Sequence, residues 1–178
     1  TIIIGTQTWM AENLKVTKLT NGQNITHISD IANWQGSGYQ YYAYSNENVS
    51  AGSYGNLYSL SVANDGVCIE GWHVPTDDEW QVLIDYLGGE DVAGGKLKDN
   101  INWNGTNESG FTSLPGGYIF YHSSSTSLGS FESSGFYWTS TGGAPNNRHW
   151  IWQTTSNNNV WHGGHPKDGG QSIRCIQD

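Results

Sequence analysis

Basic side chains are scarce in this sequence of 178 residues. Lys and Arg together number 7 against 16 Asp and Glu, which gives a formal net charge of −9 at pH 7. A nucleic-acid-binding protein needs a basic face that neutralises phosphates, and an anionic membrane surface makes the same demand. We therefore predict no nucleic-acid partner and no attraction to an anionic membrane.

Long apolar stretches are missing as well. The sequence contains no apolar run of about 18 residues, so we predict no transmembrane helix and no membrane insertion. It also shows no signal peptide, and it starts at Thr1 in strand-like sequence. We expect one domain over residues 1–178, an excised and monomeric module of a longer protein.

The chain has only two cysteines, Cys68 and Cys175. One even pair, far apart in a chain that looks secreted, most simply forms one long-range disulfide. A bridge that closes a loop of about 100 residues would stabilise the fold by roughly 4–5 kcal/mol in the chain-entropy model. The alternative is two free buried thiols. If the bridge forms, no thiol is left for catalysis.

One helix is well marked by local signals. Thr76 is a good N-cap, and Glu79 three residues later completes a capping box. The positions that follow at helical spacing form one apolar face: Trp80, Leu83, Ile84 and Leu87. Gly88-Gly89 suits the left-handed end of a helix. These signals predict a helix over about Asp77–Leu87.

The rest of the chain reads as short elements among loops rich in Gly, Asn and Ser. We predict a second, shorter helix over Leu57–Ala63 and loops between Gly89 and Gly117. The predicted strands are Gly117–Tyr121, Phe136–Ser140, His149–Thr154, Asn159–His162 and Ser172–Ile176. Helices followed by strands, with 24 Gly and nine Trp, predict a loop-rich α+β domain.

Several stretches together resemble a known family. They are Ile4–Leu14, Tyr54–Tyr58, Gly71–Trp80, Ser109–Tyr118, Tyr137–Thr141 and Ser172–Cys175. In this order they resemble the Fibrobacter succinogenes major paralogous domain. That family is similar to the formylglycine-generating-enzyme branch of the C-type-lectin-like folds. The resemblance implies a C-type-lectin-like α+β domain with two short helices and small antiparallel sheets, in an extracellular protein of the bacterial cell surface.

The same resemblance bears on catalysis. A formylglycine-generating enzyme needs a pair of reactive cysteines besides any structural bridge. Here Cys175 matches the structural cysteine, and the positions of the catalytic pair carry none. The sequence also lacks a Gly-x-Ser-x-Gly elbow, a His-Glu-x-x-His motif and a phosphate-binding loop, although its many serines leave a Ser-His-Asp triad open. We predict a protein that is not an enzyme, because a fold alone does not imply an activity.

The segment Ala144–Gly170 is the candidate ligand face, because the late loops and strands carry the ligand in C-type-lectin-like folds. Exposed aromatic rings there would stack on a sugar or pack against a peptide; the alternative is that its three Trp are core. His162 and His165 have a metal-like spacing, and exposed loop histidines are the alternative. The predicted ligand-binding residues are Asn147, Arg148, Trp152, Trp161, His162, His165 and Asp168.

Calcium is the expected cofactor, because an acidic, Asn-rich domain offers the hard oxygen ligands that calcium prefers. The predicted metal ligands are Asn146, Asn147, Asn157 and Asp168. The sugar motifs Glu-Pro-Asn and Gln-Pro-Asp of the lectins are absent, which favours a peptide over a glycan. We therefore expect a calcium-assisted adhesion module for a peptide or protein segment on another cell surface. The alternatives are a glycan-binding module, a formylglycine-generating-type enzyme and a structural spacer.

Overall fold

A computed structural model of the protein describes residues 1–44, 54–122, 125–142 and 147–178, without the side chains of residues 147–150, 152 and 165. Within them the helices are the 3₁₀-helix η1 (Ile31–Asn33), α1 (Leu60–Asn64), α2 (Asp77–Tyr86) and α3 (Glu90–Leu97). The strands are β1 (Ile2–Ile4), β2 (Gln7–Trp9), β3 (Thr26–Ile28), β4 (Gln40–Ala43), β5 (Asn56–Ser59), β6 (Trp72–His73), β7 (Tyr118–His122), β8 (Ser125–Gly129), β9 (Ser134–Gly142), β10 (Asn147–Thr154), β11 (Val160–Pro166), β12 (Gly170–Gln171) and β13 (Ile176–Gln177). The mixed α+β, loop-rich class is confirmed, with one α-helix more than the two expected. No helix of the described residues is long and apolar enough to cross a membrane.

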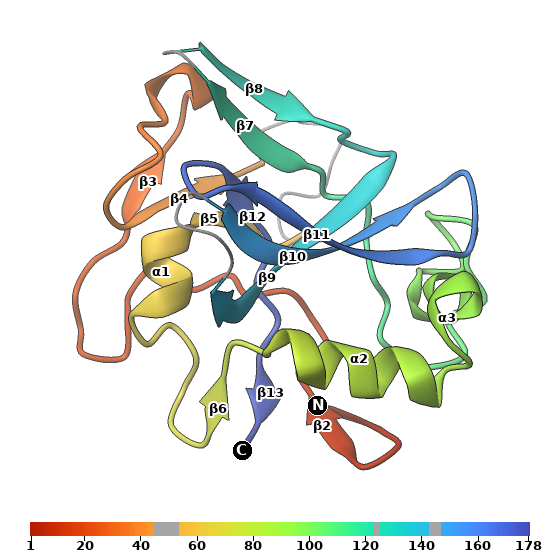
Figure 1. Ribbon diagram of the computed structural model, residues 1–178. Helices are drawn as coiled ribbons and strands as arrows, with labels where there is room; N and C mark the ends of the chain where they lie inside the picture. The colour runs from red at the N-terminus through yellow and green to blue at the C-terminus, as the bar shows by residue number, and fades with distance from the viewer. Residues whose placement is uncertain (45–53, 123–124, 143–146) are drawn as a thin grey trace.

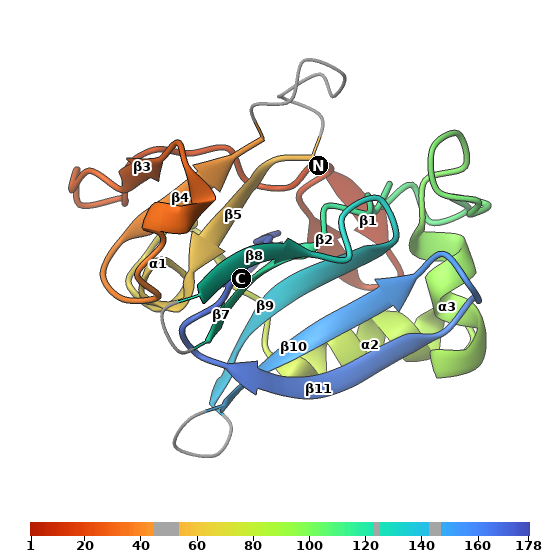
Figure 2. The ribbon, with the colours of Figure 1, turned by 90° about the horizontal axis from the view of Figure 1, so that it is seen from above.

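The described strands form three small sheets. Their strand orders are β3-β4-β5-β12-β7-β8, β1-β2-β13-β6 and β11-β10-β9. All pairings between these strands are antiparallel except the parallel pair of β3 and β4. Helix α2 contacts β9 and β10, and α3 lies at the far end of the β10–β11 hairpin (Figures 1 and 2). The hairpin that carries the predicted ligand residues is therefore supported along its length by helices.

Helix α2 confirms the prediction made from local signals. The Thr76 hydroxyl accepts from the Glu79 N–H, and the Glu79 carboxylate accepts from the Thr76 N–H, so the capping box is complete. The buried face of α2 packs on a core that includes Trp9 and Phe111. The helix ends at Tyr86, one residue before the predicted end.

The predicted helix Leu57–Ala63 is wrong in its first half. Asn56–Ser59 is strand β5, which pairs with β4 on one side and β12 on the other. All four of its residues are buried, as expected for the interior of a sheet. The helix begins only at Leu60 and ends at Asn64. Pairing with strands distant in sequence decides the conformation here.

The loop predicted after Gly89 is also wrong, since Glu90–Leu97 is helix α3. Two adjacent glycines, Gly94 and Gly95, lower its helix propensity. The structure explains them, because the β10–β11 turn lies against this helix. A Cβ on Gly94 would come within 2.5 Å of the Asn159 carbonyl oxygen. The glycines therefore permit close packing between α3 and the tip of the hairpin.

The strand predicted over Ser172–Ile176 is wrong except at Ile176. β12 ends at Gln171 in the six-stranded sheet, and β13 begins at Ile176 in the four-stranded sheet. The segment 172–175 crosses between the two sheets, and Ser172 makes an isolated bridge to Tyr137. The other four predicted strands correspond to β7, β9, β10 and β11.

The predicted disulfide between Cys68 and Cys175 is confirmed. Their Cα atoms lie 6.0 Å apart and are separated by 107 residues in sequence. Both residues are buried in a hydrophobic cluster with Trp138 and Ile173. The bridge links the C-terminal crossing segment to the middle of the chain, as expected.

Candidate functional site

A pocket of about 450 Å³ lies beside Asp168, and we call it the Asp168 pocket. Its lining residues are Gln35, Gly36, Ser37, Leu60, Ser61, Asn64, Tyr121, Lys167 and Asp168. They come from four separate parts of the fold: the loop after η1, helix α1, strand β7 and the turn between β11 and β12. Most of these side chains carry a hydroxyl, an amide or a charge, although more of the exposed pocket surface is apolar than polar. A ligand there would combine hydrogen bonds with apolar contact.

Asp168 is held in place by a buried tryptophan. The Trp34 indole N–H donates to the Asp168 carbonyl oxygen at 2.9 Å, and Trp34 is 2% exposed. Gly36 packs directly on Asp168: its φ is +68°, and a Cβ there would lie 2.5 Å from the Asp168 Cβ. Only glycine fits this position without strain. The wall of the pocket at Asp168 is thus built by the loop after η1.

That loop is itself fixed by side chains from the neighbouring strands. The Gln40 side-chain oxygen accepts from the Gln35 N–H at 3.2 Å. The Ser59 hydroxyl accepts from the Gln40 N–H at 3.2 Å and donates to the Gly38 carbonyl at 2.7 Å. Gln40 and Ser59 are both buried. These hydrogen bonds therefore fix the loop that forms one wall of the pocket.

The carboxylate of Asp168 carries an unused acceptor. Among the described residues, its Oδ1 is buried and has no hydrogen-bond partner. A buried acceptor without a donor destabilises a protein by about 1–3 kcal/mol, and more when the group is charged. Because Asp168 lines the pocket, a ligand bound there would meet its carboxylate, which suits an N–H, an O–H or a cation. Asp168 is the one residue predicted from the sequence that lines this pocket.

The other predicted ligand residues follow the register of the hairpin. Asn147 pairs with Pro166, Arg148 with His165, and Trp152 with Trp161. The backbone therefore places Asn147, Arg148 and His165 near the Asp168 end, and the two tryptophans side by side near the middle. Trp161 is partly buried. Asn146, predicted as a metal ligand, lies outside the described residues, as do the side chains of Asn147, Arg148, Trp152 and His165.

His162 does not belong to an exposed loop. It lies in β11, partly buried, with its Nδ1 2.8 Å from Asp77 Oδ1 at the start of α2. Residues three apart in a strand lie on opposite faces of the sheet, so positions 162 and 165 do not face one metal ion. The His-x-x-His interpretation is therefore wrong, because the segment is a strand.

The predicted calcium ligands are not all brought together. Asn157 lies in the turn between β10 and β11, where its carbonyl accepts from Lys98 Nζ at 2.7 Å. β10 separates it from the Asn147 and Asp168 end by more than about 20 Å at the rise of a strand. Asn157 therefore cannot share an ion with Asp168. The described residues contain no group of three or more His, Cys, Asp or Glu side chains arranged to hold a metal.

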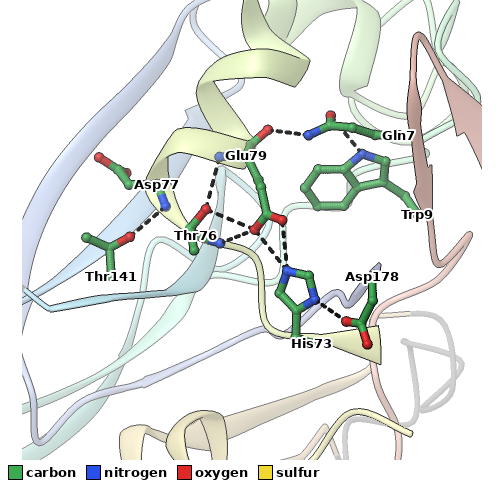
Figure 3. A network of polar contacts seen from close by, with 8 residues as sticks. All are labelled: Gln7, Trp9, His73, Thr76, Asp77, Glu79, Thr141 and Asp178. Atoms are coloured by element: carbon green, nitrogen blue, oxygen red, sulfur yellow. Dashed lines mark hydrogen bonds and ion pairs between the residues drawn. The ribbon is translucent and has the colours of Figure 1, made fainter. Parts of the chain in front are cut away.

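A second polar cluster joins α2 to the end of the chain (Figure 3). His73 Nε2 lies 2.8 Å from Glu79 Oε1, and His73 Nδ1 lies 2.6 Å from Asp178 Oδ1. Burial lowers the pKa of His73, but the hydrogen bonds and charges of Asp178 and Glu79 outweigh burial and raise it above 6.5. Burial raises the pKa of Glu79, but hydrogen bonds from Thr76 and His73 outweigh it and lower it below 4.5. Both ring nitrogens are engaged, so His73 serves as an anchor and not as a free base.

Most residues of the Asp168 pocket carry no signal in the sequence. Its wall depends on the contact between Trp34 and Asp168, which are 134 residues apart. The lining side chains are Ser, Asn, Gln and Tyr residues that no motif sets apart from other loop residues.

A comparison with protein families gives one match over nearly the whole chain. The family model described as the Fibrobacter succinogenes major domain matches residues 2–177. This range includes every residue that lines the Asp168 pocket. No curated protein and no solved structure matches the chain.

Proposed function

The chain belongs to the Fibrobacter succinogenes major domain family, and we propose that it is a non-catalytic, extracellular binding module for a peptide or protein segment. The observation that carries this proposal is Asp168, which lines a pocket of about 450 Å³ and whose buried Oδ1 has no hydrogen-bond partner among the described residues. A preformed cavity with a few convergent polar groups is the usual form of a binding site.

A peptide suits this site because it supplies N–H donors. A lysine, an arginine or a main-chain N–H would each satisfy the Asp168 carboxylate. The net charge of −9 adds a long-range attraction for a basic segment. Tyr121 offers a ring for packing at the same site. We infer that the preferred ligand is a basic peptide segment.

An exported location is part of the proposal. The disulfide between Cys68 and Cys175 supports it, because such bridges persist in oxidising compartments. We place the domain in an adhesion protein at the bacterial cell surface, with a C-type-lectin-like arrangement of its α+β elements. Both cysteines are used in the bridge, so a reactive thiol of the formylglycine-generating type would require its reduction.

A glycan is the second candidate ligand. Ser37, Ser61 and Asn64 line the pocket with hydroxyl and amide groups, and Tyr121 adds an aromatic ring. Sugars are bound by such a combination of hydrogen bonds and stacking. The Asp168 carboxylate would then accept from a sugar hydroxyl.

We retain calcium in the proposal only for a site at Asp168, next to the end of the β10–β11 hairpin. Asp168 would supply the one carboxylate of the pocket, and amide, hydroxyl and main-chain oxygens would complete the shell. Such an ion would also satisfy the Asp168 Oδ1. Binding assays should therefore be run both with calcium and with a chelator.

The test is a screen on arrays of basic, neutral and acidic peptides and on a glycan array, followed by variants. Asp168→Asn keeps the shape of the side chain but removes its charge, and should weaken binding by about tenfold or more. Glu70→Gln removes one negative charge at an exposed position outside the pocket, and should leave binding unchanged. Equal binding by wild type and Asp168→Asn would refute the proposed site.

A further inference from the structure

Arg174 is a buried cation in the segment that crosses between β12 and β13. It is 1% exposed. Its Nε and Nη2 donate to Asn13 Oδ1 at 3.0 and 2.6 Å, and its Nη1 donates to the Phe111 carbonyl. The guanidinium carbon lies 4.0 Å from the centroid of the Phe111 ring. All of these partners are neutral.

Among the described residues, the charge of Arg174 has no counter-ion. Within the part of the chain that the structure describes, no Asp or Glu oxygen lies within 4.0 Å of its nitrogens. Glu12 acts on it only from a distance, and that carboxylate is exposed and paired with Lys15 at 2.6 Å. Arginine stays protonated in proteins, and an unpaired buried charge is costly. The fold therefore holds a positive charge that its own residues do not neutralise.

Arg174 also lines a cavity of about 350 Å³, which we call the Arg174 cavity. Its lining residues are Ala11, Glu12, Asn13, Lys15, Thr112, Leu114 and Arg174. Two of the seven Lys and Arg residues of the chain thus meet here, against one acid. In a domain with a net charge of −9, this is a local excess of positive charge.

The unused donors define the ligand chemistry. A guanidinium has five N–H groups, and three are taken by Asn13 and Phe111. One N–H on each terminal nitrogen is left, and guanidinium N–H groups form strong, charge-assisted hydrogen bonds with carboxylate oxygens. Lys15 can release Glu12 and add a second positive contact, because both of these side chains are exposed.

We propose that the Arg174 cavity binds a carboxylate, with Arg174 as the buried fork and Lys15 as the cation at the rim. The carboxylate belongs to a sugar acid or to an acidic amino acid, because both carry this group. The proposal goes beyond the peptide site, because the Arg174 cavity and the Asp168 pocket share no lining residue. Either site can therefore fail without the other.

The experiment is a titration of the ¹⁵N-labelled protein followed by NMR, with the Arg174 Nε–H signal as the reporter. The probes are acetate, glucuronate and N-acetylglutamate, and the neutral controls are glucose and N-acetylglutamine. The acids should give saturable shifts of this signal with a Kd in the millimolar range or tighter, and the neutral controls should give none. Glucuronate alone would identify a sugar acid, N-acetylglutamate alone an acidic residue, and all three acids a general carboxylate site.

Two variants with the same change in charge complete the test. Lys15→Gln removes the rim cation and should weaken acid binding several-fold, without touching the buried Arg174. Lys96→Gln removes a cation that pairs with Glu108 at 3.8 Å and lies outside the cavity, and should leave binding unchanged. The proposal is overturned if no acid shifts the Arg174 signal, if the neutral controls bind equally, or if both variants weaken binding to the same degree. In those cases Arg174 is only a structural cation held by Asn13 and the Phe111 ring.

Discussion

The two glycines of helix α3 allow a test of how the β10–β11 hairpin is held. Replacing Gly with Ala inside a helix normally stabilises it by about 1 kcal/mol. At Gly94, however, the new Cβ would lie 2.5 Å from the Asn159 carbonyl oxygen and 2.6 Å from the Asn158 carbonyl oxygen. Both atoms belong to the backbone of the hairpin turn, so the turn must move. Overpacking of this kind costs about 1–3 kcal/mol.

The matched control is the next residue in the same helix. At Gly95 the nearest atoms belong to the amide of the Asn158 side chain, at 2.7 Å. Asn158 is exposed, so its amide can turn away at little cost. We expect Gly95→Ala to be neutral or to stabilise by up to about 1 kcal/mol. We expect Gly94→Ala to destabilise by about 1–2 kcal/mol, because the clash outweighs the gain in propensity.

Urea unfolding followed by circular dichroism measures both changes in the free energy of unfolding. The test depends on the difference between the two variants in the free energy of unfolding, because the change in helix propensity is the same for both. If Gly94→Ala is as stable as Gly95→Ala, the hairpin turn does not pack on α3 as described. Hydrogen exchange of the amides in the 155–159 turn gives a second measurement, and should increase only in Gly94→Ala.

Three further predictions follow from the disulfide, the His73 cluster and the calcium proposal. Replacing Cys68 and Cys175 with Ser opens a loop of 107 residues and should lower the free energy of unfolding by about 4–5 kcal/mol; a loss below about 1 kcal/mol would contradict the entropic account. The raised pKa of His73 means that its contribution to stability is complete below pH 6.5 and is lost as pH rises through the folded-state value. His73→Gln should therefore destabilise more near pH 5.5 than near pH 8.5, by less than about 1 kcal/mol because the side chain is partly exposed, and equal effects at both pH values would refute this. Calcium should raise the melting temperature relative to a chelator, and unchanged curves at about millimolar calcium would remove it from the proposal.

Local signals predicted the parts of the fold whose stability is local. Helix α2 was found because its capping box and apolar face lie within one stretch of sequence. The disulfide was found by counting, since two cysteines allow only one pairing. Neither inference required knowledge of the remaining chain.

The errors occurred where distant contacts decide the conformation. Strand β5 resembles the start of a helix until β4 and β12 pair with it on both sides. Helix α3 resembles a loop because Gly94 and Gly95 serve the packing of a hairpin turn more than 60 residues away. The Asp168 pocket depends on Trp34, which no spacing rule connects to the β11–β12 turn. Sequence periodicity carries no information about contacts between segments that are far apart in the sequence.

The two proposed sites share one physical argument, which concerns buried charge. Most buried polar groups here have partners; for example, the Lys98 ammonium donates to two carbonyls, and the Trp138 indole donates to the Tyr58 carbonyl. Neutral exceptions such as the Gln153 amide cost comparatively little, because an uncharged group loses less on leaving water. Among the described residues, the Oδ1 of Asp168 has no hydrogen-bond partner, and Arg174 has only neutral partners. Each also lines a cavity, so a ligand of opposite charge can supply what the fold does not.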